Sequence, residues 1–314
     1  MAPRGLLTAL MGNASVPEGT GRALTDSGAD AGQSPMAGEA EGTRPPTGRV
    51  AIVTGAGRGI GRAMALGLAR AGIRVVATAA RERAELDAVA AEIGQDRVLP
   101  VLADVTREAD AQHVIALALQ RWARLDILVN NAGRGMKYVS ESFMTLPTRF
   151  WEVEPDTWRM VIDTNVNGPF LMARAAVPHM LRAGWGRIVN VSMNHSTMRR
   201  AGFSPYGPSK AALESETLIW AQDLAGSGVT VNALLPGGAT RTGMIPAALP
   251  TSARSALLDP AVMVPPLLWL ASAAADAITG CRVTACRWEE GNPTAAIESA
   301  GWGGADTLAQ PSGG

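Results

Sequence analysis

Cysteine, histidine and tyrosine are scarce in this chain of 314 residues. The only cysteines, Cys281 and Cys286, cannot form a disulfide framework, so we expect a reducing, cytoplasmic location. The three histidines lie far apart and lack the spacing of a metal site, so no bound metal is expected. Tyrosine occurs only at positions 138 and 206, which leaves two candidates for any mechanism that uses a phenol.

Net charge and long apolar runs are missing as well. Lys and Arg together number 28, as do Asp and Glu, so no general field attracts nucleic acid or an anionic membrane. No apolar run reaches the ~20 residues that a membrane-spanning helix needs. Neither a G-x-S-x-G motif nor a Walker lysine loop occurs, which disfavours hydrolases and nucleoside triphosphatases. A small molecule is therefore the expected partner, with no nucleic acid and no membrane.

The composition divides the chain into three parts. Residues 1–47 are rich in Gly, Ala, Ser, Thr and Pro and are expected to be a flexible extension. Their apolar cluster LLTALM is too short for a signal-peptide core, and the acidic residues argue against a mitochondrial presequence. Residues 48–288 have the regular texture of one folded domain. Residues 289–314 show no periodicity and are expected to be a C-terminal tail.

Apolar strands alternate with amphipathic helices throughout the central part. RVAIVT, IRVVATA, LDILVN, RIVNVS and VTVNALL are rich in β-branched residues, and helical stripes such as RAMALGLARAG separate them. This alternation is typical of a parallel sheet covered by helices on both faces. The predicted fold class is α/β, a single doubly wound Rossmann-type domain with a parallel sheet of about seven strands flanked by helices.

A glycine-rich turn follows the first predicted strand. There the backbone can approach a ligand closely, and the amides at a helix N-terminus can receive a phosphate. The pattern is T-G-x-x-x-G-x-G rather than a strict G-x-G-x-x-G. We expect a dinucleotide to bind at this turn, whose residues are Thr54, Gly55, Gly57, Arg58, Gly59, Ile60 and Gly61.

The second predicted strand decides between NAD and NADP. An acidic residue at its end would bind the ribose hydroxyls of NAD and repel a further phosphate. The strand ends in VVATAAR, with no acidic residue before Glu82. Arg58 and Arg81 are placed to bind a 2′-phosphate, although both could equally be solvated surface arginines. NADP (NADPH) is therefore favoured over NAD.

Tyr206 and Lys210 lie four residues apart on a predicted helix and so share one face. A free tyrosine has a pKa of about 10. A neighbouring ammonium and a cationic nicotinamide ring favour the phenolate and are expected to lower that pKa. Tyr206 could then exchange a proton with a hydroxyl or a carbonyl oxygen.

The motifs TGAGRGIG, LADVT, NNAG, TNVNGPF, YGPSK and NALLPGG occur in this order between residues 48 and 288. Together they resemble the short-chain dehydrogenase/reductase family. The resemblance implies that Asp104, with Val105, contacts adenine and that Asn165 belongs to a catalytic proton relay. It implies that Lys210 holds the nicotinamide ribose, and that further cofactor contacts come from Asn131, Ala132, Gly133, Pro236, Gly237 and Thr242, or Thr240 in place of Thr242.

The catalytic serine of the family has no clear counterpart. Counting back from Tyr206 by the spacing usual in the family reaches Met193, with Ser192 one residue earlier. Side chains alternate faces along a strand, although a bulge or turn at the strand end can re-aim them. Ser192 is the first candidate to orient the substrate oxygen and Asn194 the second; a site without such a donor is the third. His195 is expected to be an ordinary loop residue.

The expected function is therefore an NADP(H)-dependent oxidoreductase that interconverts a carbonyl and a secondary alcohol by hydride transfer. Tyr206 would be the general acid/base, with Lys210, Ser192 and Asn165 in the roles above. The alternative is a catalytically silent dinucleotide-binding sensor or scaffold, which Met193 keeps open. The loops at the expected site carry several methionines and phenylalanines, which suggests an apolar pocket for a small carbonyl or alcohol substrate. The resemblance also implies a homotetramer or homodimer.

Overall fold

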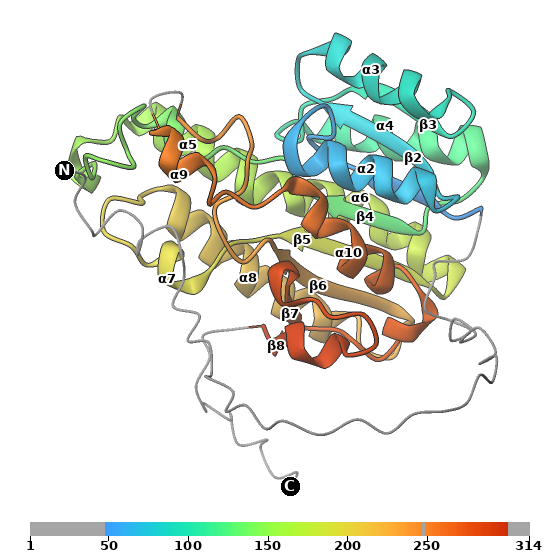
Figure 1. The fold of residues 1–314 in the computed structure, drawn as a ribbon. Coiled ribbons are helices and arrows are strands. Elements are labelled where there is room, and N and C mark those ends of the chain that lie inside the picture. Colours follow the sequence, from blue (N-terminus) through green and yellow to red (C-terminus); the bar gives the residue numbers. More distant parts are fainter. Residues whose placement is uncertain (1–47, 247–248, 301–314) are drawn as a thin grey trace, which may run out of the picture.

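The sheet of this protein has eight strands in the order β3-β2-β1-β4-β5-β6-β7-β8 (Figure 1). The structure is a computed structural model, and it describes residues 48–246 and 249–300. Strands β1 to β7 are parallel, and β8 runs antiparallel to β7. The strands are β1 Val50–Val53, β2 Arg74–Ala79, β3 Val98–Leu102, β4 Ile127–Asn130, β5 Gly186–Val191, β6 Val229–Leu235, β7 Cys281–Thr284 and β8 Ile297–Ser299.

Helices cover both faces of the sheet, because alternate strand residues point to opposite sides. The longer helices are α2 Gly59–Arg70, α3 Arg83–Ile93, α4 Glu108–Trp122, α5 Pro155–Ile162, α6 Gly168–Ala183, α8 Tyr206–Asp223 and α10 Val264–Leu270. In β1, Ala51 and Val53 pack into one apolar core with α2, α3 and α10, whereas Val50 and Ile52 pack into a second core with α4, α6 and α8. The predicted α/β, doubly wound fold is confirmed.

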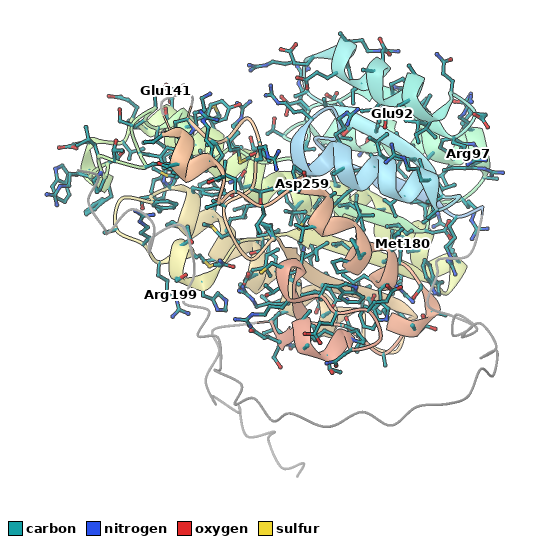
Figure 2. All side chains as sticks on the ribbon, viewed as in Figure 1. Glu92, Arg97, Glu141, Met180, Arg199 and Asp259 are labelled. Carbon is teal, nitrogen blue, oxygen red and sulfur yellow. The ribbon has the colours of Figure 1, made fainter. Side chains whose placement is uncertain are left out.

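The burial of side chains follows this layering of helices and sheet (Figure 2). Met180 on α6 is fully buried, whereas Glu92 and Arg97 are exposed at the outside of the molecule. Within the described ranges, no helix is both long enough and apolar enough to cross a membrane.

The direction in which successive strands are added to the sheet reverses between β1 and β4. From β1 the chain goes to β2 and β3 on one side, and it returns to β4 on the other side. In doubly wound sheets a ligand-binding crevice lies beyond the carboxyl ends of the strands at such a reversal. The turn after β1 and the turn after β4 should therefore both border a binding cleft.

One helical segment is irregular, and one element differs from the expectation. The segment before β5 consists of α5, a π-helical turn at Asp163–Asn167, and α6. The expected C-terminal tail contributes β8, which pairs with β7 through Val283 and Ile297 among others. The expected extension at 1–47 and residues 301–314 of the expected tail lie outside the described residues.

Candidate active site and dinucleotide cleft

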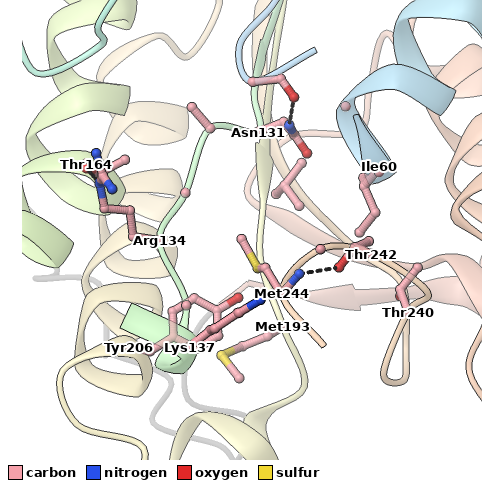
Figure 3. A pocket seen from close by; sticks show the side chains of 18 of the residues that line it. Ile60, Asn131, Arg134, Lys137, Thr164, Met193, Tyr206, Thr240, Thr242 and Met244 are labelled. Carbon is pink, nitrogen blue, oxygen red and sulfur yellow. Dashed lines mark hydrogen bonds between the residues drawn. The ribbon is translucent and has the colours of Figure 1, made fainter. Parts of the chain in front are cut away.

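A cleft with a volume of about 670 Å³ opens beyond the carboxyl ends of the central strands (Figure 3). It is lined by the glycine-rich turn, by the segments that follow β2, β3 and β4, by the end of β5, by the first turns of α8 and by residues 236–245. Tyr206 and Met193 lie on one side of the pocket in Figure 3, and Ile60 and Thr242 lie on the other.

The glycine-rich turn packs closely against its neighbours because its glycines carry no side chain, and it lines the cleft. Gly55 has a φ of +64°, in the left-handed region that favours glycine. A Cβ on Gly61 would lie 2.1 Å from the Gly55 carbonyl oxygen and 2.4 Å from Nδ2 of Asn131. The turn opens α2 with its amides, which suits a diphosphate. This part of the cleft therefore fits the dinucleotide that the sequence predicts.

The turn after β4 holds the glycine-rich turn in place. Asn131 Nδ2 donates to the carbonyl oxygens of Thr54 at 2.8 Å and of Gly55 at 3.1 Å. The Thr54 hydroxyl oxygen accepts hydrogen bonds from the backbone amides of Asn131 and Ala132, both at 3.0 Å. Asn131 and Thr54 thus join the turns that follow the neighbouring strands β1 and β4. Gly133, two residues after Asn131, lines the cleft.

Charges of both signs lie at the end of the cleft that β2 and β3 form. Arg58, Arg81, Asp104 and Val105 line it, as the sequence predicts. Asp104 Oδ1 accepts hydrogen bonds from the amide and the hydroxyl of Thr106. Sequence reasoning missed Glu85 of α3, which also lines the cleft and lies 3.5 Å from Arg58 in an ion pair.

The segment after β6 borders the cleft as well, and Thr242 lies beside Gly59 of the glycine-rich turn. Pro236, Gly237, Thr240 and Thr242 all line the cleft. The Thr242 hydroxyl oxygen accepts a hydrogen bond from the Met244 amide at 3.3 Å (Figure 3). Asn194 Nδ2 donates to the Gly237 carbonyl oxygen at 2.8 Å, so the loop after β5 is tied to the loop after β6.

Tyr206 and Lys210 stand on the first two turns of α8 and line the cleft together. Lys210 Nζ donates to the Val191 carbonyl oxygen at 2.7 Å, which anchors α8 to the end of β5. Burial lowers the pKa of Lys210 to about 8, and the charge of Glu214 acts against that shift. Burial raises the pKa of Tyr206 to about 12. The expected lowering of the Tyr206 pKa by Lys210 is therefore outweighed by desolvation in the protein alone.

Asn165 lies in the π-helical turn and is completely buried. Its Oδ1 accepts from the Arg134 amide at 2.7 Å, and its Nδ2 donates to the Arg134 carbonyl at 3.0 Å and to the Ser209 hydroxyl at 2.9 Å. The Ser209 hydroxyl in turn donates to the Tyr206 carbonyl oxygen. Asn165 thus connects the turn after β4 with the start of α8. Single π-helical turns frequently occur at functional sites.

Ser192, Met193 and Asn194, which follow β5, all line the cleft. Each of the three side chains contacts a different part of the protein. The Ser192 hydroxyl donates to Glu214 Oε1 at 2.5 Å. The Met193 side chain belongs to an apolar cluster with Met136, Met198 and Phe203, against which Tyr206 packs. The predicted role of Ser192 at the substrate oxygen, and that of Asn194 as its alternative, therefore stay predictions.

Sequence reasoning missed a buried ion pair behind this strand end. Arg282 of β7 donates to both carboxylate oxygens of Glu214 of α8 at 2.7 Å, and the two side chains are only 3% and 5% exposed. Two features of the sequence could have indicated it. Glu214 continues the stripe of Tyr206 and Lys210 at a spacing of four residues, and Arg282 is a charged residue within the apolar stretch CRVTAC.

Known proteins share this architecture. A 3-oxoacyl-[acyl-carrier-protein] reductase of Synechocystis is 38% identical over 193 residues, which are 61% of this chain and 74% of that protein. A crystal structure of the 3-ketoacyl-(acyl-carrier-protein) reductase from Brucella melitensis with NADH has 33% identity and a TM-score of 0.66. It matches 75% of this chain and 96% of that one.

A second solved structure, from Beutenbergia cavernae, contains NADP at low occupancy and is assigned as an NAD(P)-dependent gluconate 5-dehydrogenase. It has 33% identity and a TM-score of 0.65, and it matches 76% of this chain and 95% of that one. The model of the short chain dehydrogenase family matches residues 49–252. With this match and the cleft described above, the chain belongs to the short-chain dehydrogenase family.

Proposed function

We propose that this protein is an NADP(H)-dependent oxidoreductase that interconverts a carbonyl and a secondary alcohol. The observation that carries the proposal is the pair of Tyr206 and Lys210, which line the cleft from one face of α8 beyond the glycine-rich turn. The nicotinamide supplies the hydride when it is bound. The residues of the chain bind the dinucleotide, orient the substrate and transfer the proton.

Tyr206 is the proposed general acid/base. In reduction its hydroxyl donates a proton to the substrate oxygen, and in oxidation the phenolate accepts it. The raised pKa of Tyr206 keeps the phenol protonated in the protein alone, which suits the reductive direction. The Lys210 ammonium and the cationic ring of an oxidised cofactor would favour the phenolate. Lys210 has three donors, and one of them is bonded to Val191, so we propose that another holds the nicotinamide ribose.

Asn165 is proposed to support a proton relay that ends at Lys210. Its side chain fixes the turn at Arg134 and, through Ser209, the first turn of α8. A Cβ built on Gly133 would lie 3.3 Å from Asn165 Oδ1 and 3.8 Å from Lys210 Nζ, so the backbone of Gly133 runs beside both groups. This geometry supports Asn165 as the residue that fixes the position of Lys210 relative to the turn after β4.

The preference for NADP rests on Arg58 and Arg81 at the adenosine end of the cleft. A guanidinium binds a phosphate bidentately, and we propose that Arg58 of the glycine-rich turn binds the 2′-phosphate in this way. Glu85 acts against this preference because its carboxylate already pairs with Arg58. One related structure holds NADH and another holds NADP, so the preference must come from the charges of this chain.

A test of the function uses a panel of aldehydes and ketones with NADPH or NADH. Wild-type protein should oxidise NADPH with at least one of them, and Tyr206→Phe should lower kcat by roughly a hundredfold or more because the proton donor is lost. NADPH affinity, measured by fluorescence titration, should remain within a few-fold of wild type.

A second candidate is a silent dinucleotide-binding protein, favoured by one observation. Met193 belongs to the apolar cluster against which Tyr206 packs, and it occupies the position where the spacing usual in the family places a serine. Tight binding of NADPH without turnover of any substrate, and with no effect of Tyr206→Phe, would establish this candidate and refute the enzyme.

We further propose a homodimer or homotetramer in a reducing, cytoplasmic location. Phe170 of α6 and Ile219 of α8 are 45% and 52% exposed. An outer groove between these helices is lined by Phe170, Val177, Trp220 and Leu224 among others. Exposed apolar surface of this kind is typical of a protein contact. Sedimentation velocity measures the oligomeric state directly.

A further inference from the structure

A buried polar cluster joins three elements behind the wall of the cleft. Glu214 of α8 accepts hydrogen bonds from Arg282 of β7 and from Ser192, which follows β5. Its Oε2 also lies 2.9 Å from Nε2 of His195. Arg282 also donates to the Met193 carbonyl oxygen at 3.2 Å. We name this group, Ser192, His195, Glu214 and Arg282, the Glu214 cluster.

The cluster holds the strand end on both sides of Met193. Ser192 is fixed through its hydroxyl, Met193 through its own carbonyl oxygen, and His195 through its ring. Between these contacts the side chain of Met193 packs into the apolar cluster that Tyr206 contacts. The only hydrogen of the Ser192 hydroxyl is donated to Glu214.

The energetics favour a fixed geometry. Nη1 of Arg282 donates to both oxygens of the Glu214 carboxylate, and such charge-assisted hydrogen bonds are roughly twice as strong as neutral ones. The two side chains are almost completely shielded from water, so removing one partner would leave an uncompensated buried charge. The strand end therefore cannot rotate Ser192 toward the substrate without breaking a contact to that carboxylate.

We propose that Glu214 and Arg282 are positioning residues that set the substrate wall of the cleft. They fix the end of β5 so that Met193, and not a hydroxyl, lies beside Tyr206. Ser192 serves as an anchor of the strand end, and an apolar group of the substrate packs against Met193. This inference rests on the proposed function for its kinetic consequence, but its structural part is independent of turnover.

The structural part is tested by NMR of protein with ¹³C-labelled methionine methyl groups, in which Met193→Leu assigns the Met193 resonance. Glu214→Gln and Arg282→Gln should each shift or broaden the Met193 methyl resonance. Met64 of α2 belongs to a separate apolar core and should keep its resonance. Glu92→Gln breaks the exposed pairs with Arg62 and Arg70 and is the control, which should leave Met193 unchanged.

The kinetic part is a double-mutant cycle with an aryl or alkyl ketone that wild-type protein reduces. Glu214→Gln should raise KM by about fivefold or more in the wild-type background and by less than twofold in Met193→Ala, because the pair acts through that side chain. Ser192→Ala should raise KM more than it lowers kcat.

Three results would overturn the proposal. These are an unshifted Met193 resonance in Glu214→Gln, an equal rise in KM in both backgrounds, and a hundredfold loss of kcat in Ser192→Ala. If wild-type protein shows no turnover that depends on Tyr206, the proposed function fails, and the NMR result alone still decides whether Glu214 and Arg282 position Met193.

Discussion

Lys210 carries a positive charge at a position that is almost completely buried. Its pKa is lowered to about 8 from the 10.5 expected for an exposed lysine. Between these two pH values the unfolded chain holds a proton that the folded chain has lost. The free energy of unfolding should therefore rise with pH in this window, and the gain is lost as the pH falls through 8.

Lys210→Met should remove this dependence. Between pH 8 and 9.5 the stability of wild-type protein should rise by roughly 2 kcal/mol relative to that of the variant, as measured by urea unfolding. Lys137→Met, at a partly exposed lysine of the cleft, should keep the wild-type trend. Parallel curves for wild type and Lys210→Met would contradict the assigned burial of the ammonium.

Glu85 should weaken the preference for NADPH. Glu85→Gln removes the negative charge beside Arg58, so the ratio of kcat/KM for NADPH to that for NADH should rise about two- to fivefold, as an exposed pair allows. Glu92→Gln removes an acid that pairs with Arg62 and Arg70 outside the cleft, and the ratio should stay constant. A ratio that falls in Glu85→Gln would show that Arg58 does not meet the 2′-phosphate.

Single residues differ in how well the sequence predicts them. Thr54, Asn131, Tyr206 and Lys210 line or support the cleft as expected, because each follows directly from a motif on a strand end or helix start. The environment of Ser192 could not be predicted. It depends on Glu214 and Arg282, which approach from 22 and 90 residues further along the chain and meet only in the folded sheet.

At the scale of elements, α8 carries a second unusual carboxyl. Burial raises the pKa of Glu216 to about 7, and within the described part of the chain its Oε2 has no hydrogen-bond partner. The folded protein holds this proton above pH 4.5, where the unfolded chain has released it. Stability should therefore fall as the pH rises from 4.5 to 7.

Glu216→Gln should abolish this fall and stabilise the protein at pH 7.5 by about 1–2 kcal/mol, a value reduced for partial solvent screening. Denaturant unfolding at pH 5 and pH 7.5 measures the difference. Asp223→Asn, at an exposed acid on the same helix, is the control and should change neither value. Equal destabilisation of Glu216→Gln at both pH values would show that the side chain is ionised in the fold.

Most helices and strands can be predicted from hydrophobic periodicity. The strands correspond to continuous apolar runs of sequence, and β5, for example, is buried along its whole length. The π-helical turn is different. It adds a residue to one turn of an otherwise regular helix, and the hydrogen bonds of Asn165 to Arg134 and Ser209 accompany it. Such tertiary contacts have no counterpart in local periodicity.

At the scale of the whole molecule, β8 closes one edge of the sheet. It pairs with β7 through Cys281, Arg282 and Val283, and Ala296 just before it is buried in the core. Strand β8 was not predicted because three residues give no period that can be recognised. An uncovered β7 would present unpaired backbone groups.

Deletion of residues 289–314 should expose that edge. The variant should be less stable by roughly 1–3 kcal/mol and should aggregate on mild heating, as followed by light scattering. Deletion of residues 301–314 alone keeps β8 and should behave like the full chain. If the longer deletion were as stable and as monodisperse as the shorter one, β8 would contribute nothing to the sheet.

One helix serves two surfaces of this molecule. The first turns of α8 carry Tyr206 and Lys210 into the cleft, and its last turns carry Trp220 and Asp223 to the outer groove. Because a helix is stiff along its axis, a displacement at one end is transmitted to the other. Misplacement of a catalytic group by about 1 Å can cost a hundredfold in rate. Whatever occupies the outer groove would thus gain control over chemistry that it never touches.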